Sequence, residues 1–172
     1  MNARVITLQK KFPVFPEDDA ISLKRRLSNA SGEILIDAIE KIKKGVKGKK
    51  QEGKPSYARK LKKEDGRIKW DRKATEIHNL IRGVVEWPTA FTYIETEKGK
   101  KLIKIFKSEI GKEKGKFGKI GEIIEIGNDF IEVACGEGTI KIKEIQIEGK
   151  RKMEVSEFLR GHKINPHSFF IS

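Results

Sequence analysis

The sequence has little of what redox, metal and membrane proteins need. It contains one cysteine, three histidines and two tryptophans in 172 residues. The lone Cys135 cannot form an internal disulfide or a cysteine-based zinc site. No apolar run approaches the ~20 residues that span a bilayer, and residues 1–11 lack the pattern of a signal peptide. We therefore expect a cytoplasmic protein with no membrane partner and no bound metal.

The usual signatures of nucleotide, metal and acid–base chemistry are also missing. No Gly-Lys pair precedes Ser or Thr, and no Gly-x-Gly-x-x-Gly follows an expected strand, so no P-loop or dinucleotide site is predicted. His162 and His167 are five residues apart in the sequence, a poor spacing for metal ligands without a third group. His78 lies in an expected helix, and the carboxylates are scattered among lysines. The residues themselves indicate no catalytic site.

Positive charge is in excess, and it is concentrated. The chain has 38 Lys and Arg against 25 Asp and Glu, a net charge of +13. Residues 1–40 carry a net charge of 0, residues 41–73 carry +11, and residues 74–172 carry +2. Charge segregated in this way attracts polyanions and releases counterions from a nucleic acid. A solvated lysine-rich linker has the same composition, so both interpretations stay open on charge alone.

The first 44 residues have the pattern of a strand followed by two helical segments. A strand is expected over 5–14, where apolar side chains share one face. Apolar residues then recur at helical spacing over 21–30 and 34–42, between an aspartate cap and a stop at Gly45. These segments cannot bury their own apolar faces well. They therefore resemble the end of something larger or a surface for a partner.

The rest of the chain reads as a linker and a small β domain. Residues 45–66 have no apolar periodicity and predict an extended basic linker. A helix capped by Asp71 is expected over 72–82, and another over 156–160, before a polar tail. Period-two patterns separated by glycine turns predict five strands, at 91–94, 101–106, 120–126, 130–134 and 139–147. The alternation shifts at Lys143-Glu144, which indicates a bulge. Such strands favour a small antiparallel barrel or sandwich.

One long motif carries a resemblance to a known family. It reads Tyr57-Ala58-Arg59-Lys60-Leu61-Lys62-Lys63-Glu64-Asp65-Gly66-Arg67-Ile68-Lys69-Trp70. This resembles the linker and domain entry of methionyl-tRNA formyltransferases. Further matches follow in the same order, at 76–83, Trp87-Pro88-x-Ala90-Phe91-Thr92, 134–138, 148–153 and 158–162. Residues 12–45 also resemble the last part of that family's catalytic domain, so the resemblance covers essentially the whole chain.

The resemblance implies a fold and a division into parts. Residues 67–172 would be an open Greek-key barrel similar to an oligonucleotide-binding fold, making the chain α+β and mainly β. Residues 45–66 would be the basic linker, and residues 1–44 the strand–helix remnant of the catalytic domain. The part of the family's catalytic domain that carries its catalytic residues and transfers formyl from 10-formyltetrahydrofolate matches no part of this sequence. No catalytic or cofactor-binding residue is therefore carried over, and the cofactor expectation for this chain is none.

The resemblance also implies that the basic segment lies along initiator methionyl-tRNA. The side chains expected to neutralise phosphates without reading bases are Lys43, Lys44, Lys47, Lys49, Lys50, Arg59, Lys60, Lys62, Lys63 and Arg67. Trp70, Trp87 and Phe91 either stack on unpaired acceptor bases or pack where helix meets barrel. Three departures from the family's usual residues are Lys69 for Asp, Glu86 for Pro and Glu154 for Ser.

Three functions follow as alternatives. In the first, the chain is the tRNA-binding part of a formyltransferase and is inactive alone. In the second, residues 1–44 dock onto a separately encoded catalytic half and restore formylation. In the third, the chain is a stand-alone basic RNA-binding module without a role in formylation.

Overall fold

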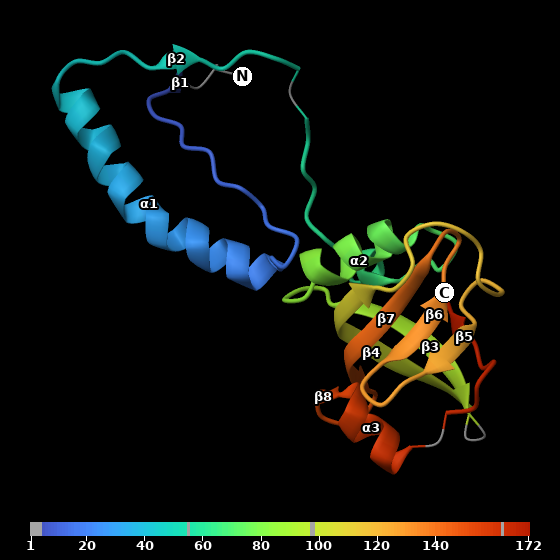
Figure 1. The fold of residues 1–172 in the computed structure, drawn as a ribbon. Helices are drawn as coiled ribbons and strands as arrows, with labels where there is room; N and C mark the ends of the chain where they lie inside the picture. Colours follow the sequence, from blue (N-terminus) through green and yellow to red (C-terminus); the bar gives the residue numbers. More distant parts are fainter. Residues whose placement is uncertain (1–4, 55, 97–98, 163) are drawn as a thin grey trace. The chain divides into compact units, whose positions relative to one another are not determined.

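The computed structural model describes residues 5–54, 56–96, 99–162 and 164–172 (Figure 1). Internal contacts divide the chain into two compact units, Met1–Lys60 and Leu61–Ser172. No helix within the described ranges is both long enough and apolar enough to cross a membrane.

The first unit contains one long helix, α1 (Ala20–Lys43). Asp19 caps it by accepting a hydrogen bond from the backbone N–H of Ser22 at 2.7 Å. Gly45 adopts a φ of +75° just beyond its end, as predicted for a glycine stop. The two helical segments expected here are one continuous helix of 24 residues. Gly32 does not interrupt it, because a helical glycine costs only about 1 kcal/mol relative to alanine.

The strand expected over 5–14 is wrong beyond its first two residues. Strand β1 (Val5–Ile6) pairs antiparallel with β2 (Lys49–Lys50), and residues 7–15 form no strand. A strand needs a partner for its backbone groups, and β2 supplies one only for Val5 and Ile6. The expected linker is therefore not wholly irregular, because it contains β2 and a 3₁₀ turn, η1 (Lys63–Gly66).

The second unit is built on a seven-stranded antiparallel sheet that curls into an open half-barrel (Figure 1). Its strands are β3 (Ala90–Thr96), β4 (Gly99–Ile110), β5 (Ile123–Ile126), β6 (Ile131–Ala134), β7 (Thr139–Ile147), β8 (Met153–Glu154) and β9 (Phe170–Ile171). Their order is β5-β6-β7-β4-β3-β9, with β8 paired to β7. The mainly-β, antiparallel and open architecture predicted from the sequence is confirmed.

The strand boundaries show where pairing overrides local pattern. β7 has the predicted bounds, and its register against β4 shifts at Lys143, as the alternation indicated. β4 extends four residues past its expected end, because pairing continues beyond this shift to Ile110 opposite Ile140. β5 begins at Ile123 rather than 120, since Gly121 turns the chain with a φ of +80°.

Two helices accompany the sheet, α2 (Ala74–Gly83) and α3 (Val155–Gly161). Helix α2 begins two residues later than expected, and Asp71 does not cap it. The reason is tertiary: the backbone N–H of Ala74 donates to the carbonyl of Glu137 at 2.8 Å, and Lys73 bridges to the same residue. Glu137, far along the sequence, thus sets the start of the helix.

The core lies inside the curled sheet and under α2. Its fully buried large side chains include Trp70, Ile77, Ile105 and Ile140. The tail expected to be polar also contributes, because Phe170 of β9 is only 4% exposed and stacks on Trp70 with ring centroids 5.7 Å apart. The end of the second unit therefore packs against its beginning.

Candidate nucleic-acid interface

Seven of the ten predicted tRNA-binding cations belong to the first unit. Lys43 ends α1, Lys44 is its C-cap, and Lys49 and Lys50 form β2. The seven, all exposed, are Lys43, Lys44, Lys47, Lys49, Lys50, Arg59 and Lys60. They project from a helix end, a loop and a short strand.

The other three, Lys62, Lys63 and Arg67, surround η1 at the start of the second unit. The turn forms because the Asp65 carboxylate accepts a hydrogen bond from the backbone N–H of Lys62 at 2.6 Å. Gly66 closes it against the loop before β3, where a Cβ atom would lie 2.2 Å from the carbonyl oxygen of Thr89. This contact fixes two exposed lysines to the edge of the half-barrel.

Arg67 follows the turn and is anchored at β3. The next backbone N–H, that of Ile68, donates to the carbonyl of Phe91 at 2.8 Å. The Arg67 guanidinium donates to the carbonyl of Ser172 at 2.5 Å and lies 5.9 Å from the ring centroid of Tyr93. Arg67 therefore has a defined place on the rim of the second unit.

The electrostatics of these cations suit a polyanion. Within the described residues, no carboxylate pairs with the nine side chains Lys43, Lys44, Lys47, Lys49, Lys50, Lys60, Lys62, Lys63 and Arg67. Lys73 and Lys143 differ, since hydrogen bonds to Glu137 and Asp129 respectively raise their pKa values. A phosphate can approach the nine without displacing a protein carboxylate.

The three aromatic candidates separate clearly by burial. Trp70 is 1% exposed and its indole N–H donates to the Thr92 hydroxyl at 2.9 Å, while Phe91 is 7% exposed. Both are core residues. Trp87 is 60% exposed, so core packing is wrong for this residue, and it keeps an open ring face. Sequence alone did not distinguish the two tryptophans.

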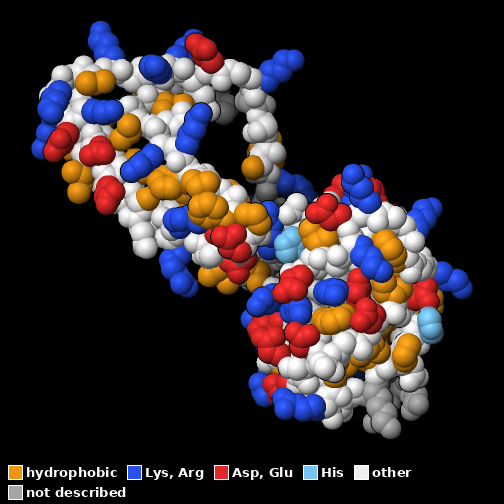
Figure 2. Space-filling model, in the orientation of Figure 1, with side chains coloured by type: hydrophobic (Ala, Val, Ile, Leu, Met, Phe, Trp, Pro, Cys, Tyr) orange, Lys and Arg blue, Asp and Glu red, His pale blue; other side chains and the backbone are white. Residues whose placement is uncertain are grey.

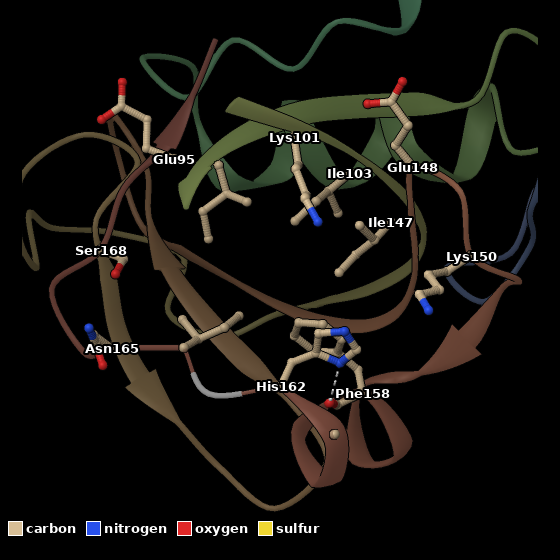
Figure 3. A pocket seen from close by; sticks show the side chains of 13 residues that line it. Glu95, Lys101, Ile103, Ile147, Glu148, Lys150, Phe158, His162, Asn165 and Ser168 are labelled. Atoms are coloured by element: carbon tan, nitrogen blue, oxygen red, sulfur yellow. Dashed lines mark hydrogen bonds between the residues drawn. The ribbon is translucent and has the colours of Figure 1, made fainter. Parts of the chain in front are cut away.

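A cavity of about 700 Å³ opens at the mouth of the half-barrel (Figure 3). Its floor is apolar, formed by Ile94, Ile103, Ile147 and Phe158, and Lys101 points into it from β4. The rim carries both signs of charge, and none of the ten predicted cations lines it. The predicted nucleic-acid surface therefore lies outside this cavity.

Of the remaining reactive side chains, Cys135 and His78 are packed, whereas His167 is exposed and its Nδ1 lies 2.8 Å from Oε1 of Glu122. Cys135 is buried, and burial raises the pKa of its thiol to about 12. His78 is half-buried with Nδ1 3.0 Å from the Ser108 hydroxyl oxygen. Among the described residues, no group of three or more His, Cys, Asp or Glu is placed to hold a metal ion. The exposed cations of this surface can bind anions.

The second unit is a curled antiparallel half-barrel that begins at a basic turn, and this architecture is the structural class to which the protein belongs. The family described as "Formyl transferase, C-terminal domain" matches residues 60–163. The chain therefore belongs to the formyl transferase C-terminal domain family.

Relatives and solved structures extend this comparison. The chain is 36% identical to methionyl-tRNA formyltransferase of Citrifermentans bemidjiense over 161 residues, which is 92% of this chain and 48% of that protein. It is 39% identical to methionyl-tRNA formyltransferase of Thermodesulfovibrio yellowstonii, over 93% of this chain and 50% of that protein. The chain thus spans about half the length of the curated relatives it matches. HypX from Aquifex aeolicus in complex with tetrahydrofolic acid is similar in fold, with a TM-score of 0.64 at 19% identity, covering 95% of this chain and 29% of that one.

Proposed function

We propose that this chain binds initiator methionyl-tRNA and positions it for formyl transfer from 10-formyltetrahydrofolate, which another part of a formyltransferase would carry out. One observation carries the proposal: nine exposed cations that pair with no carboxylate among the described residues fall between Lys43 and Arg67 in the sequence, within the stretch 41–73 that has a net charge of +11. The names of the relatives supply the substrate class. A cytoplasmic location goes with this role in translation initiation.

The proposed mechanism is electrostatic. Lysines and arginines that contact phosphates release condensed counterions, which gives affinity and orientation without base recognition. Each phosphate contact contributes a slope of about −0.9 to the dependence of log affinity on log salt for a duplex. In this proposal the chain is inactive alone, because no residue in it is assigned a catalytic role.

The first test is a salt titration of tRNA binding. Initiator methionyl-tRNA and an unrelated tRNA are titrated at several salt concentrations against the chain and a variant with Lys60→Ala, Lys62→Ala and Lys63→Ala. If the three lysines contact phosphates, the salt slope of the variant becomes shallower by about 2.7. The matched control is Lys73→Ala, Arg151→Ala and Lys152→Ala, which removes equal charge from side chains that already pair with carboxylates. An equal loss in both variants would contradict the proposal.

A second candidate function rests on the apolar side of α1. Apolar side chains gather along this helix (Figure 2), and no residue of α1 is buried. This favours the alternative in which residues 1–44 dock onto a catalytic half and restore formylation. Mixing the chain with a purified catalytic half and 10-formyltetrahydrofolate tests it. A rate no higher than that of the catalytic half alone would exclude this function.

A further inference from the structure

The face of β3 and β4 that carries Tyr93 also carries cations, and it lies beside the basic turn η1 at the start of the second unit. Side chains alternate along β3, so Thr92 and Ile94 are buried, while Tyr93 lies on the other side of the strand. Lys100 of β4 has its Nζ 4.5 Å from the Tyr93 ring centroid, and the guanidinium of Arg67 lies 5.9 Å from it. One ring therefore holds two cations beside the turn that carries Lys62 and Lys63.

The charges around Tyr93 are not neutralised by carboxylates. Within the described ranges, no Asp or Glu side chain pairs with Arg67 or Lys100, although Glu95 is opposite Lys100 in the strand register. One guanidinium nitrogen of Arg67 donates to the main-chain oxygen of Ser172. Phe130 offers a direct contrast at the other side of the sheet. Its two lysines, 4.2 and 5.3 Å from its centroid, pair with Glu132 and with Asp129 and Glu109. Of these two clusters, the one at Tyr93 keeps its cations free of Asp and Glu partners among the described residues.

Trp87 lies near the surface where the turn η1 meets the start of strand β3, which is the η1–β3 junction. Its neighbours Pro88 and Thr89 pack on Gly66, the last residue of η1, and Trp87 itself is 60% exposed. It lies six residues before Tyr93, so an extended chain places the two at most about 20 Å apart. Single-stranded nucleic acid binds where aromatic faces lie beside cations, over sites of roughly 4–16 nucleotides.

We infer that the η1–β3 junction, with Trp87, Tyr93, Arg67 and Lys100, is a subsite for unpaired nucleotides of RNA. Trp87 stacks on a base, while Arg67 and Lys100, held at the ring of Tyr93, bind the neighbouring phosphates. The inference rests on the proposed function and adds to it: the linker lysines hold paired regions of the tRNA, and this surface holds unpaired nucleotides. The sequence identified Arg67 and Trp87 but missed Tyr93 and Lys100, whose proximity depends on the register of β3 against β4.

Tryptophan fluorescence tests the stacking step in the full chain. An unstructured single-stranded RNA of about 10 nucleotides and an RNA duplex are the probes, a length chosen from the site sizes of such domains. Single-stranded RNA should quench the emission of the wild-type chain, and Trp87→Phe should abolish most of that quenching because Trp70 is buried. Trp87→Ala should weaken single-strand binding roughly 5- to 150-fold, the range for loss of one stacked base, and change duplex binding less than twofold.

Two further variants separate this surface from general charge and aromatic effects. Tyr93→Ala should weaken binding of both probes, because Arg67 and Lys100 lose the ring that positions them. Phe130→Ala should leave both affinities unchanged and is the matched control. Quenching that persists in Trp87→Phe, or wild-type affinity in Trp87→Ala, would overturn the subsite.

The outcomes also separate this inference from the tRNA proposal. If tRNA binding depends on Lys60, Lys62 and Lys63 but single-strand binding ignores Trp87, the subsite fails and the tRNA proposal stands. If Trp87 is quenched by single strands but initiator and unrelated tRNAs bind equally, the subsite stands and specific tRNA positioning fails.

Discussion

The two units treat the same kind of apolar pattern in opposite ways. In the second unit, Ile77 and Ile81 lie on the apolar stripe of helix α2 and are only 2% and 1% exposed. In the first unit, α1 also has an apolar stripe, yet Leu35 and Ile42 on it are 61% and 60% exposed. Periodicity therefore predicts that an element forms, and it does not predict that the same unit covers the apolar face. The second unit has its own core, while the apolar face of α1 is left exposed by its own unit, as the face of a binding surface would be.

The largest expected difference between the units is in core truncation. Ile105→Ala should lower the free energy of unfolding by about 2–5 kcal/mol, because it leaves a cavity under the sheet. Ile39→Ala makes the same change on α1, where the side chain is 44% exposed, and should stay within about 0.5 kcal/mol. Urea unfolding followed by circular dichroism measures both. Equal losses would show that α1 is packed in solution.

The next effect concerns the turn that presents Lys62 and Lys63. Gly66→Ala forces a Cβ against the Thr89 carbonyl and should cost about 1–3 kcal/mol, the usual range for overpacking. Gly83→Ala is the control, since nothing lies within 4 Å of its Cβ position. The same unfolding experiment compares them. A Gly66→Ala variant as stable as Gly83→Ala would mean that η1 is not held against the β3 loop.

A smaller effect is expected from pH. Burial lowers the pKa of His78, Arg82 lowers it further, and Glu109 partly offsets this. The unfolded chain therefore binds a proton more readily, so the stability contributed by neutral His78 is present above about pH 6.5 and is lost as pH falls. Unfolding at pH 8, 7, 6 and 5 should show a steeper decline for the wild type than for His78→Gln. Parallel curves would contradict a buried neutral imidazole.

The smallest expected effect concerns the chemical reactivity of the Cys135 thiol and involves no change in stability. Because burial raises the pKa of the Cys135 thiol to about 12, a thiol reagent at pH 8 should modify the native chain far more slowly than the urea-unfolded chain. Absorbance of the released chromophore follows the reaction. Rapid labelling of the native chain would place Cys135 outside the core of the second unit.

Local sequence was sufficient where neighbouring residues decide the structure. The bounds of β7 and the shift at Lys143 follow from alternation, and Asp19 and Gly45 delimit α1 through ordinary capping chemistry. The start of α2 was mispredicted because Glu137, far along the chain, binds the backbone that Asp71 would have capped. The buried end strand was missed because its partners, Trp70 and strand β3, lie far back in the sequence.

The candidate site was predictable to a similar extent. Lysines in a segment without apolar periodicity have to be exposed, so their placement followed from composition. The roles of Trp70 and Trp87 did not follow, because burial depends on which side of the half-barrel each residue reaches. The association of Tyr93 with Lys100 requires knowing that β3 and β4 pair with Glu95 opposite Lys100. The positions of charged residues can therefore be predicted from the sequence, whereas contacts between residues on different strands require the strand register.

The meeting of the second unit's two ends has a consequence for its engineering. Arg67 holds the carbonyl of Ser172, and the backbone N–H of Trp70 donates to the Ser172 hydroxyl at 3.2 Å. The unit is thus nearly a closed ring of chain, and domains with adjacent ends commonly tolerate circular permutation. A glycine linker could join Ser172 to Leu61, the first residue of the second unit, and new ends could be opened in the exposed loop at 112–116. The basic turn would then be an internal segment of the chain instead of its entry.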